Sequence, residues 1–232
     1  MRFLFDFTIS LAGLMLISPA LSIMMILIWF QDFKTPFYIA QRVGLHGEPF
    51  RIIKLRTMIY EADAYGVNST SSDDKRITHI GHFIRRYKLD ELPQLINVLF
   101  ATMSLVGPRP QVKQDTDRYT KVERHLLDVK PGITDLSSIV FSDEGDILKG
   151  SIDPDLTYNR IIRPWKSRLG LLYIKKQSFF LDLWIIILTL ISFMSKEKAL
   201  KHIESILIKW NANHDLIEVS RRKSPPYYYP PP

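Results

Sequence analysis

The chain has 232 residues, enough for one domain of ordinary size with an appendage. Its 31 Lys and Arg residues exceed its 24 Asp and Glu residues, and the resulting formal charge of +7 favours anionic partners such as nucleic acid, nucleotides or an anionic membrane surface. It contains no cysteine, which excludes disulfides and thiolate metal sites, and its histidines do not have the spacing of a zinc site (His46, His79, His82, His125, His202 and His214).

The N-terminal segment 3–30, FLFDFTISLAGLMLISPALSIMMILIWF, is apolar except for Asp6. It is too long for the apolar region of a signal peptide, and no small-residue cleavage site follows it. As one straight helix its 28 residues would measure about 42 Å, against roughly 30 Å of bilayer hydrocarbon. Ser18-Pro19 predicts a kink at its middle, because proline removes a backbone hydrogen bond, and the Ser18 hydroxyl can satisfy the freed carbonyl. A kinked span and a re-entrant hairpin of two half-helices are favoured equally by these features.

The next segment, 37–58 (FYIAQRVGLHGEPFRIIKLRTM), contains two β-rich runs around Gly44 and Gly47 and predicts a β-hairpin. Alternation along its second run would place Lys54 and Arg56 on the same face, as a small pair of cations. Residues 61–76 are polar and lack a periodic pattern, which predicts a loop or a mobile lid.

Two helices are predicted after this loop. Residues 77–89, ITHIGHFIRRYKL, have apolar residues at helical spacing and basic residues in the last turn. Residues 89–100, LDELPQLINVLF, have the apolar stripe of a buried helix. Since Pro93 is tolerated only in the first turn, this second helix is expected to start near Asp90.

The following region alternates rigid, turn and helical signals. VGPRP at 106–110 cannot be helical, and VKPGITD at 129–135 indicates a turn. YNRIIRPWKSRLGLLYIKK at 158–176 is basic and predicts a helix after Pro164.

A second apolar segment, 178–194 (SFFLDLWIIILTLISFM), has 17 residues with one charge, Asp182, and is short for a membrane span. Trp184 and the flanking lysines indicate an amphipathic helix that lies in the membrane interface (Lys175, Lys176 and Lys196). The sequence thus predicts an α/β protein, mostly helical with a small β-hairpin, with membrane segment 1–31, catalytic domain 32–220 and a flexible Pro/Tyr-rich tail 221–232.

The acidic pair Asp90-Glu91 lies between the basic sequences FIRRYK and VGPRP. A helix N-cap explains Asp90 but neither its acidic neighbour nor Arg109 between two prolines. A helix N-terminus favours anions and would hold a carboxylate pKa low, so that the ionised group can bind Mg²⁺ or attack phosphorus. Four basic residues can add charge-assisted hydrogen bonds to phosphoryl oxygens (Lys54, Arg56, Arg85 and Arg109).

The segment 37–58, together with DDKRITHIGHFIRRYKLDELPQLINVLFATMSLVGPRP and KPGITD, closely resembles the bacterial sugar transferases called monotopic phosphoglycosyl transferases. The resemblance extends from the N-terminal apolar segment to about Phe193. It implies transfer of a sugar-1-phosphate from a UDP-sugar to polyprenyl (undecaprenyl) phosphate, with release of UMP. This is the first membrane step of O-antigen, capsule, exopolysaccharide or glycoprotein glycan synthesis, at the cytoplasmic face of the bacterial inner membrane. The resemblance also implies a re-entrant membrane helix broken at Ser18-Pro19, in contact with membrane lipids.

The same resemblance assigns roles within the site. Asp90 matches the family's nucleophile, which attacks the β-phosphate and forms a phosphosugar–Asp intermediate. Glu91 matches its partner, which helps to hold Mg²⁺ on the diphosphate. Pro108-Arg109-Pro110 matches the family's Pro-Arg-Pro, and the substrate-binding positions are Lys54, Arg56, Arg85 and Arg109.

Two departures from the family pattern concern the donor and an acidic position. Residues 131–145, PGITDLSSIVFSDEG, stand where many members have PGITG, a Trp-Ala-Gln run and a later Asn-Gly-Arg, so the resemblance does not identify the sugar. Family habit favours an N-acetylated or modified amino sugar, or a hexose such as galactose. Gly170 stands where many members have Asp, so an acidic role there is lost or moves to Asp135 or Asp182.

Two alternatives differ in class from this enzyme. A membrane-anchored basic module that binds nucleic acid or acidic lipid needs only charge, and leaves Asp90-Glu91 unexplained. A phosphatase or hydrolase with an aspartyl-phosphate needs water as acceptor, whereas two membrane-facing segments favour a lipid. Nucleic acid is therefore not expected as a partner, and the sequence leaves open whether the protein forms a homodimer.

Overall fold

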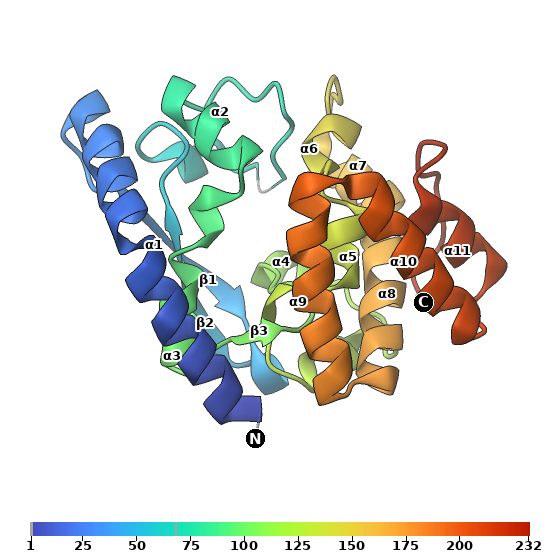
Figure 1. Cartoon of the computed structure of the whole chain (residues 1–232). Helices are drawn as coiled ribbons and strands as arrows, with labels where there is room; N and C mark the ends of the chain where they lie inside the picture. The colour runs from blue at the N-terminus through green and yellow to red at the C-terminus, as the bar shows by residue number, and fades with distance from the viewer. Residues whose placement is uncertain (1, 68) are drawn as a thin grey trace.

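Helices make up most of the fold, with two small sheets among them (Figure 1). The computed structural model describes residues 2–67 and 69–232. Helix α1 (Arg2–Asp32) runs along one side of the molecule in Figure 1, and the C-terminal helices lie on the other side, namely α8 (Arg163–Lys176), α9 (Phe179–Met194), α10 (Lys196–Lys209) and α11 (His214–Arg221). The mostly helical fold with small sheets agrees with the prediction, and the monotopic membrane arrangement stays a prediction.

Helix α1 continues through Pro19 as one element. Pro19 cannot donate to the carbonyl of Met15, and the Ser18 hydroxyl donates to that carbonyl instead, at 2.9 Å. The expected role of Ser18 is therefore confirmed. Among the described residues, α1 is the one helix long and apolar enough to cross a membrane, judged by length and composition. Whether it spans the bilayer or enters and leaves on one face stays a prediction.

The predicted hairpin is confirmed by strands β1 (Phe37–Val43) and β2 (Pro49–Leu55), which pair antiparallel around the 3₁₀ turn η1 (Leu45–Gly47). Asn97 fixes this hairpin to helix α3 (Gln94–Leu99), because its side-chain oxygen accepts from the Ile53 amide at 3.0 Å and its nitrogen donates to the Arg51 carbonyl at 2.7 Å. Helix α3 in turn packs against α1. The hairpin, α3 and α1 therefore form one packed unit.

The chain from the hairpin to α3 contains short helical elements. The expected helix near residue 80 is α2 (His79–Arg86), capped by Thr78, whose hydroxyl accepts from the Gly81 amide. The 3₁₀ turns are η2 (Ala62–Tyr65), within the expected loop, and η3 (Leu89–Glu91). The α-helix after the acidic pair begins at Gln94 with Pro93 at its N-cap, later than expected, because Asp90 and Glu91 already form the 3₁₀ turn η3.

A second sheet pairs β3 (Ser104–Val106) with β4 (Gly132–Thr134) in parallel. Part of the predicted turn at 129–135 is therefore a strand. A Cβ on Gly132 would lie 2.0 Å from the Gly107 amide nitrogen, so the close approach of the two chains requires glycine there. This contact places the segment 107–110, which contains Arg109, at the end of β3.

The C-terminal half surrounds a core that includes Trp165, Leu169 and Tyr173 of α8, all fully buried. Its shorter elements are α4 (Lys113–Thr116), η4 (Glu123–Leu127), α5 (Leu136–Val140), α6 (Glu144–Ile147), α7 (Pro154–Thr157) and the π-helix η5 (Tyr158–Ile162). The expected helix after Pro164 is confirmed by α8.

Helix α9 confirms the predicted apolar helix at 178–194. It buries Asp182, Ile185 and Leu188 at a spacing of three residues and exposes apolar side chains on the rest of its surface, among them Phe180 and Met194. The exposed side of α9 is thus apolar, so the predicted amphipathic character is not shown, and the position of α9 in a membrane stays a prediction.

The tail has neither helix nor strand after α11, as the sequence predicts, but it lies against α8. The rings of Tyr227 and Tyr229 are centred 5.3 Å and 4.3 Å from that of Trp165. The Trp165 indole nitrogen donates to the Tyr227 carbonyl at 3.1 Å. Through these contacts the tail packs against α8 and covers Trp165.

Candidate active site

The acidic pair lies on η3, a single 3₁₀ turn between α2 and α3. Lys88 precedes it in the left-handed backbone region, with φ of 56°, and Leu92 and Pro93 lead from it into α3. Asp90 is 7% exposed, and the Glu91 side chain is 15% exposed. Two ionisable groups are thus held side by side in a poorly hydrated turn, which is costly unless cations face them.

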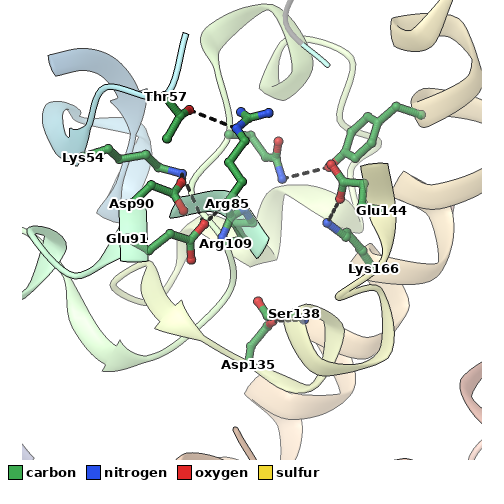
Figure 2. A network of polar contacts seen from close by, with 12 residues as sticks. Lys54, Thr57, Arg85, Asp90, Glu91, Arg109, Asp135, Ser138, Glu144 and Lys166 are labelled. Atoms are coloured by element: carbon green, nitrogen blue, oxygen red, sulfur yellow. Dashed lines mark hydrogen bonds and ion pairs between the residues drawn. The ribbon is translucent and has the colours of Figure 1, made fainter. Parts of the chain in front are cut away.

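Two cations face this pair, from β2 and from the Pro-Arg-Pro segment (Figure 2). Glu91 Oε1 accepts from Lys54 Nζ at 3.2 Å and from Arg109 Nη2 at 2.5 Å. Asp90 Oδ2 lies 3.9 Å from Lys54 Nζ. Glu91 is therefore held by two cations, whereas the Asp90 carboxylate is less engaged and freer to react.

The electrostatics separate the two carboxyls in the same way. Burial raises the pKa of Asp90, and Lys54 opposes that rise. Burial would also raise the pKa of Glu91, but Arg109 and Lys54 hold it well below its usual range. The low pKa expected for a carboxylate here thus agrees with Glu91 but not with Asp90, because burial and the neighbouring Glu91 charge outweigh the cations that act on Asp90.

The structure brings Arg85 to the site but not Arg56. Arg85 Nε donates to Thr57 Oγ1 at 3.0 Å, and Figure 2 shows its side chain beside the acidic pair. Arg56 instead forms a two-pronged ion pair with Asp32 at the end of α1, with both N–O distances 2.6 Å. Lys54 and Arg56 therefore contact different carboxylates, and Arg56 connects the end of α1 to the end of β2.

An ion pair that the sequence analysis did not identify lies on the opposite side of the site. Glu144 of α6 is ion-paired with Lys166 of α8, and Figure 2 shows both across from Asp90 and Glu91. The Lys166 ammonium lies 5.5 Å from the centre of the Tyr158 ring. The one signal in the sequence that could have identified Glu144 is its position in the segment 131–145, which differs from the pattern of the resembled family.

Asp135, Asp182 and Gly170, which were noted where the sequence differs from the family pattern, have structural roles. Asp135 caps α5, accepting from the Ser138 amide at 2.7 Å. Asp182 accepts from the Tyr173 hydroxyl at 2.6 Å and pairs with Arg2 Nε at 3.0 Å. A Cβ on Gly170 would lie 2.8 Å from Leu126 Cδ2 and 3.8 Å from Pro108 Cβ, so glycine lets α8 pack closely beside the Pro-Arg-Pro segment.

The carboxylate pair fits a magnesium ion. Within residues 2–67 and 69–232, no three His, Cys, Asp or Glu side chains cluster as ligands for a metal. Mg²⁺, however, is commonly held by one or two carboxylates, with substrate phosphates and water completing its octahedral coordination. Glu91 could supply a carboxylate oxygen to such a shared site, and Asp90 beside it would remain available to react.

Residues 1–196 match a family model described as bacterial sugar transferase. A Bacillus subtilis protein named "Uncharacterized sugar transferase EpsL" is 40% identical over 153 residues, which are 66% of this chain and 67% of that protein. Proteins of Xanthomonas campestris and Klebsiella pneumoniae named UDP-glucose:undecaprenyl-phosphate glucose-1-phosphate transferase are each 36% identical. These matches cover 70% and 79% of this chain but 32% and 38% of those longer proteins.

Proposed function

This chain belongs to the bacterial sugar transferase family, and from that premise we propose that it transfers a sugar-1-phosphate from a UDP-sugar to a membrane polyprenyl phosphate, undecaprenyl phosphate in bacteria, and releases UMP. The observation that carries the proposal is the unequal pair on η3. Glu91 is held by Lys54 and Arg109, while Asp90 is buried with one cation at 3.9 Å. A less engaged carboxylate beside strongly fixed charge suits a nucleophile that attacks a phosphoryl group.

In the proposed reaction, an Asp90 oxygen attacks the β-phosphorus of the UDP-sugar. The bond from that phosphorus to the bridging oxygen breaks, UMP leaves, and the sugar phosphate stays on Asp90. A phosphate oxygen of the polyprenyl phosphate then attacks the same phosphorus, and the bond to Asp90 breaks. The products are a polyprenyl diphosphate sugar and the regenerated carboxylate.

The basic residues stabilise charge on the phosphoryl oxygens throughout these steps. Lys54 and Arg109 are already at the carboxylates, and Arg85 adds a third cation beside them. Glu91, with Asp90 beside it, would hold Mg²⁺, which supplies neutralisation of the diphosphate charge when bound. Because Glu91 shares Oε1 between two cations, the same cations can turn to the substrate when its phosphates arrive.

Purified protein in detergent, given a panel of UDP-sugars, tests this function. We expect magnesium-dependent release of UMP from at least one donor, limited to about one UMP per protein without lipid and sustained when polyprenyl phosphate is added. Sustained release without the lipid would instead identify a hydrolase. No release from any donor would favour the binding module.

We also propose that the protein is monotopic, at the cytoplasmic face of the bacterial inner membrane. Both ends of α1 are bound to the same domain: Arg2 donates to the Val106 carbonyl at 3.0 Å, and Asp32 pairs with Arg56 at 2.6 Å. The binding of both helix ends to one domain supports an arrangement in which both ends lie on the same side of the bilayer. The exposed apolar side chains of α1, such as Leu16 at 82%, would then dip into one leaflet.

Cysteine labelling checks this topology, and because the sequence contains no cysteine, only the introduced residue can react. One cysteine is added ahead of Met1 and another replaces the exposed Lys34, in separate variants. Both are expected to react with an impermeant maleimide in inverted membrane vesicles and to stay unlabelled in right-side-out vesicles. Labelling of the N-terminal cysteine from the periplasmic side would show that α1 spans the membrane.

A further inference from the structure

Glu144 lies across the site from the catalytic pair, within electrostatic reach of Arg109. Glu91 and Glu144 both raise the pKa of Arg109. Arg109 and Lys88 act on Glu144 in return and help to lower its pKa, after Lys166, against the effect of burial. Figure 2 shows Glu144 reaching toward the site from the wall formed by α6 and α8. Glu144 therefore belongs to the surroundings of a bound donor rather than to a remote surface.

The Glu144 carboxylate is held in place from behind. Its partner Lys166 has a side chain 9% exposed, whereas that of Glu144 is 30% exposed. Beneath them, the Tyr158 hydroxyl accepts from Gln111 Nε2 at 3.1 Å, and Gln111 directly follows Pro-Arg-Pro. The buried lysine thus fixes the carboxylate, and the carboxylate is the member of the pair that a ligand can reach.

A hydrogen bond from the loop 61–76 also holds α6. The Ser72 amide donates to the carbonyl of Gly145, the residue after Glu144, at 2.9 Å. After α6, the Gly150 amide donates to Asp73 Oδ2 of the same loop at 3.3 Å. The chain that follows Glu144 is therefore tied to this loop at two points. A side chain beside a fixed backbone can discriminate between ligands that differ in the direction of one group.

We propose that Glu144, positioned by Lys166, accepts hydrogen bonds from hydroxyl groups of the donor's sugar and so contributes to the choice of UDP-sugar. This role rests on the proposed function. A carboxylate accepts hydrogen bonds and repels phosphate, so a group rich in hydroxyls suits it and the diphosphate does not. The sugar is bonded through one oxygen to the phosphorus that Asp90 attacks, whereas the uridine lies at the far end of the diphosphate. The sugar is thus the part of the donor nearest the reacting carboxylate and its surroundings.

The variant Glu144→Gln tests the role, because it keeps the size and removes the charge. We expect kcat/KM for the preferred UDP-sugar to fall about tenfold or more, the scale of one hydrogen bond to a charged group. The preference over a UDP-sugar that differs in one hydroxyl should fall toward one. Inhibition by UDP, which lacks the transferred sugar, should change less than about twofold, and this retained binding also shows that the variant is folded.

Asp146→Asn is the matched control, because it removes an exposed carboxylate from the same helix, and its kinetics should equal those of the wild type. An equal loss of UDP and UDP-sugar binding in Glu144→Gln would overturn the sugar contact and leave a general structural role for the ion pair. Unchanged sugar preference in an active Glu144→Gln protein would overturn it as well. If the wild type releases no UMP from any donor, the proposed function and this role fall together.

Discussion

Replacing Asp90 by asparagine is expected to lower turnover by several orders of magnitude, on the scale of about 4–8 kcal/mol of activation barrier. The amide has nearly the size of the carboxylate and fits the same turn, but it cannot attack phosphorus. Lys54 keeps its hydrogen bond to Glu91 in this variant, so no buried cation is left without a partner. The loss should therefore be one of chemistry rather than of folding.

Single-turnover measurement of UMP release, with thermal unfolding as the control for folding, checks the expectation for Asp90→Asn. The variant should unfold close to the wild-type temperature and release no UMP in the first turnover. Wild-type UMP release by Asp90→Asn would show that another group attacks the donor or that water does.

Glu91→Gln is also expected to lower turnover strongly, but through the loss of an electrostatic contact rather than of the nucleophile. Glu91 Oε1 accepts from both Lys54 and Arg109, and the neutral amide removes the anion that these two cations share. We expect turnover to fall on the order of 10²–10³-fold, the scale of losing one preorganised electrostatic contact. Because the metal also loses a carboxylate ligand, the magnesium concentration for half-maximal activity should rise.

A magnesium titration of Glu91→Gln beside Glu48→Gln distinguishes the loss of a metal ligand from the loss of any negative charge. Glu48 is exposed, so its variant should respond to magnesium as the wild type does. Glu91→Gln should still form the Asp90 adduct, though slowly, whereas Asp90→Asn should not. An unchanged magnesium response in Glu91→Gln would remove Glu91 from the metal site.

Local signals predicted the elements that local physics decides. The hairpin follows from alternation and from turns at Gly44 and Gly47, and α8 follows from a proline in its first turn. The Ser18 hydroxyl bond also follows from neighbours in the chain, since the carbonyl it satisfies is three residues away. In each case a few adjacent residues fix the backbone.

Features that depend on distant partners were not predictable in the same way. The strand Gly132–Thr134 is three residues long and exists because it pairs with β3, which a turn signal cannot show. The alternation that placed Arg56 beside Lys54 does not extend past the end of β2 at Leu55, and Arg56 pairs with Asp32 at the end of α1 instead. The Glu144–Lys166 pair joins residues 22 positions apart, with no common motif to connect them.

The grouping of the acidic pair with basic side chains was predictable from sequence, but the difference between the two carboxylates was not. Two adjacent acids beside so much basic sequence indicated a phosphate site. Which of them is held by cations depends on where Lys54 and Arg109 arrive from β2 and from the segment after β3. The raised pKa of Asp90 was also not predictable, because it results from burial, and burial is a property of the packed fold.

Mass spectrometry of the protein mixed with its UDP-sugar, without lipid acceptor, tests the proposed covalent step directly. We expect a mass increase of one sugar phosphate, located by peptide mapping on the peptide that contains Asp90 and absent from Asp90→Asn. Addition of polyprenyl phosphate should remove the adduct and give lipid-linked sugar. An adduct on another peptide, or UMP release by Asp90→Asn at the wild-type rate, would show that Asp90 is not the nucleophile.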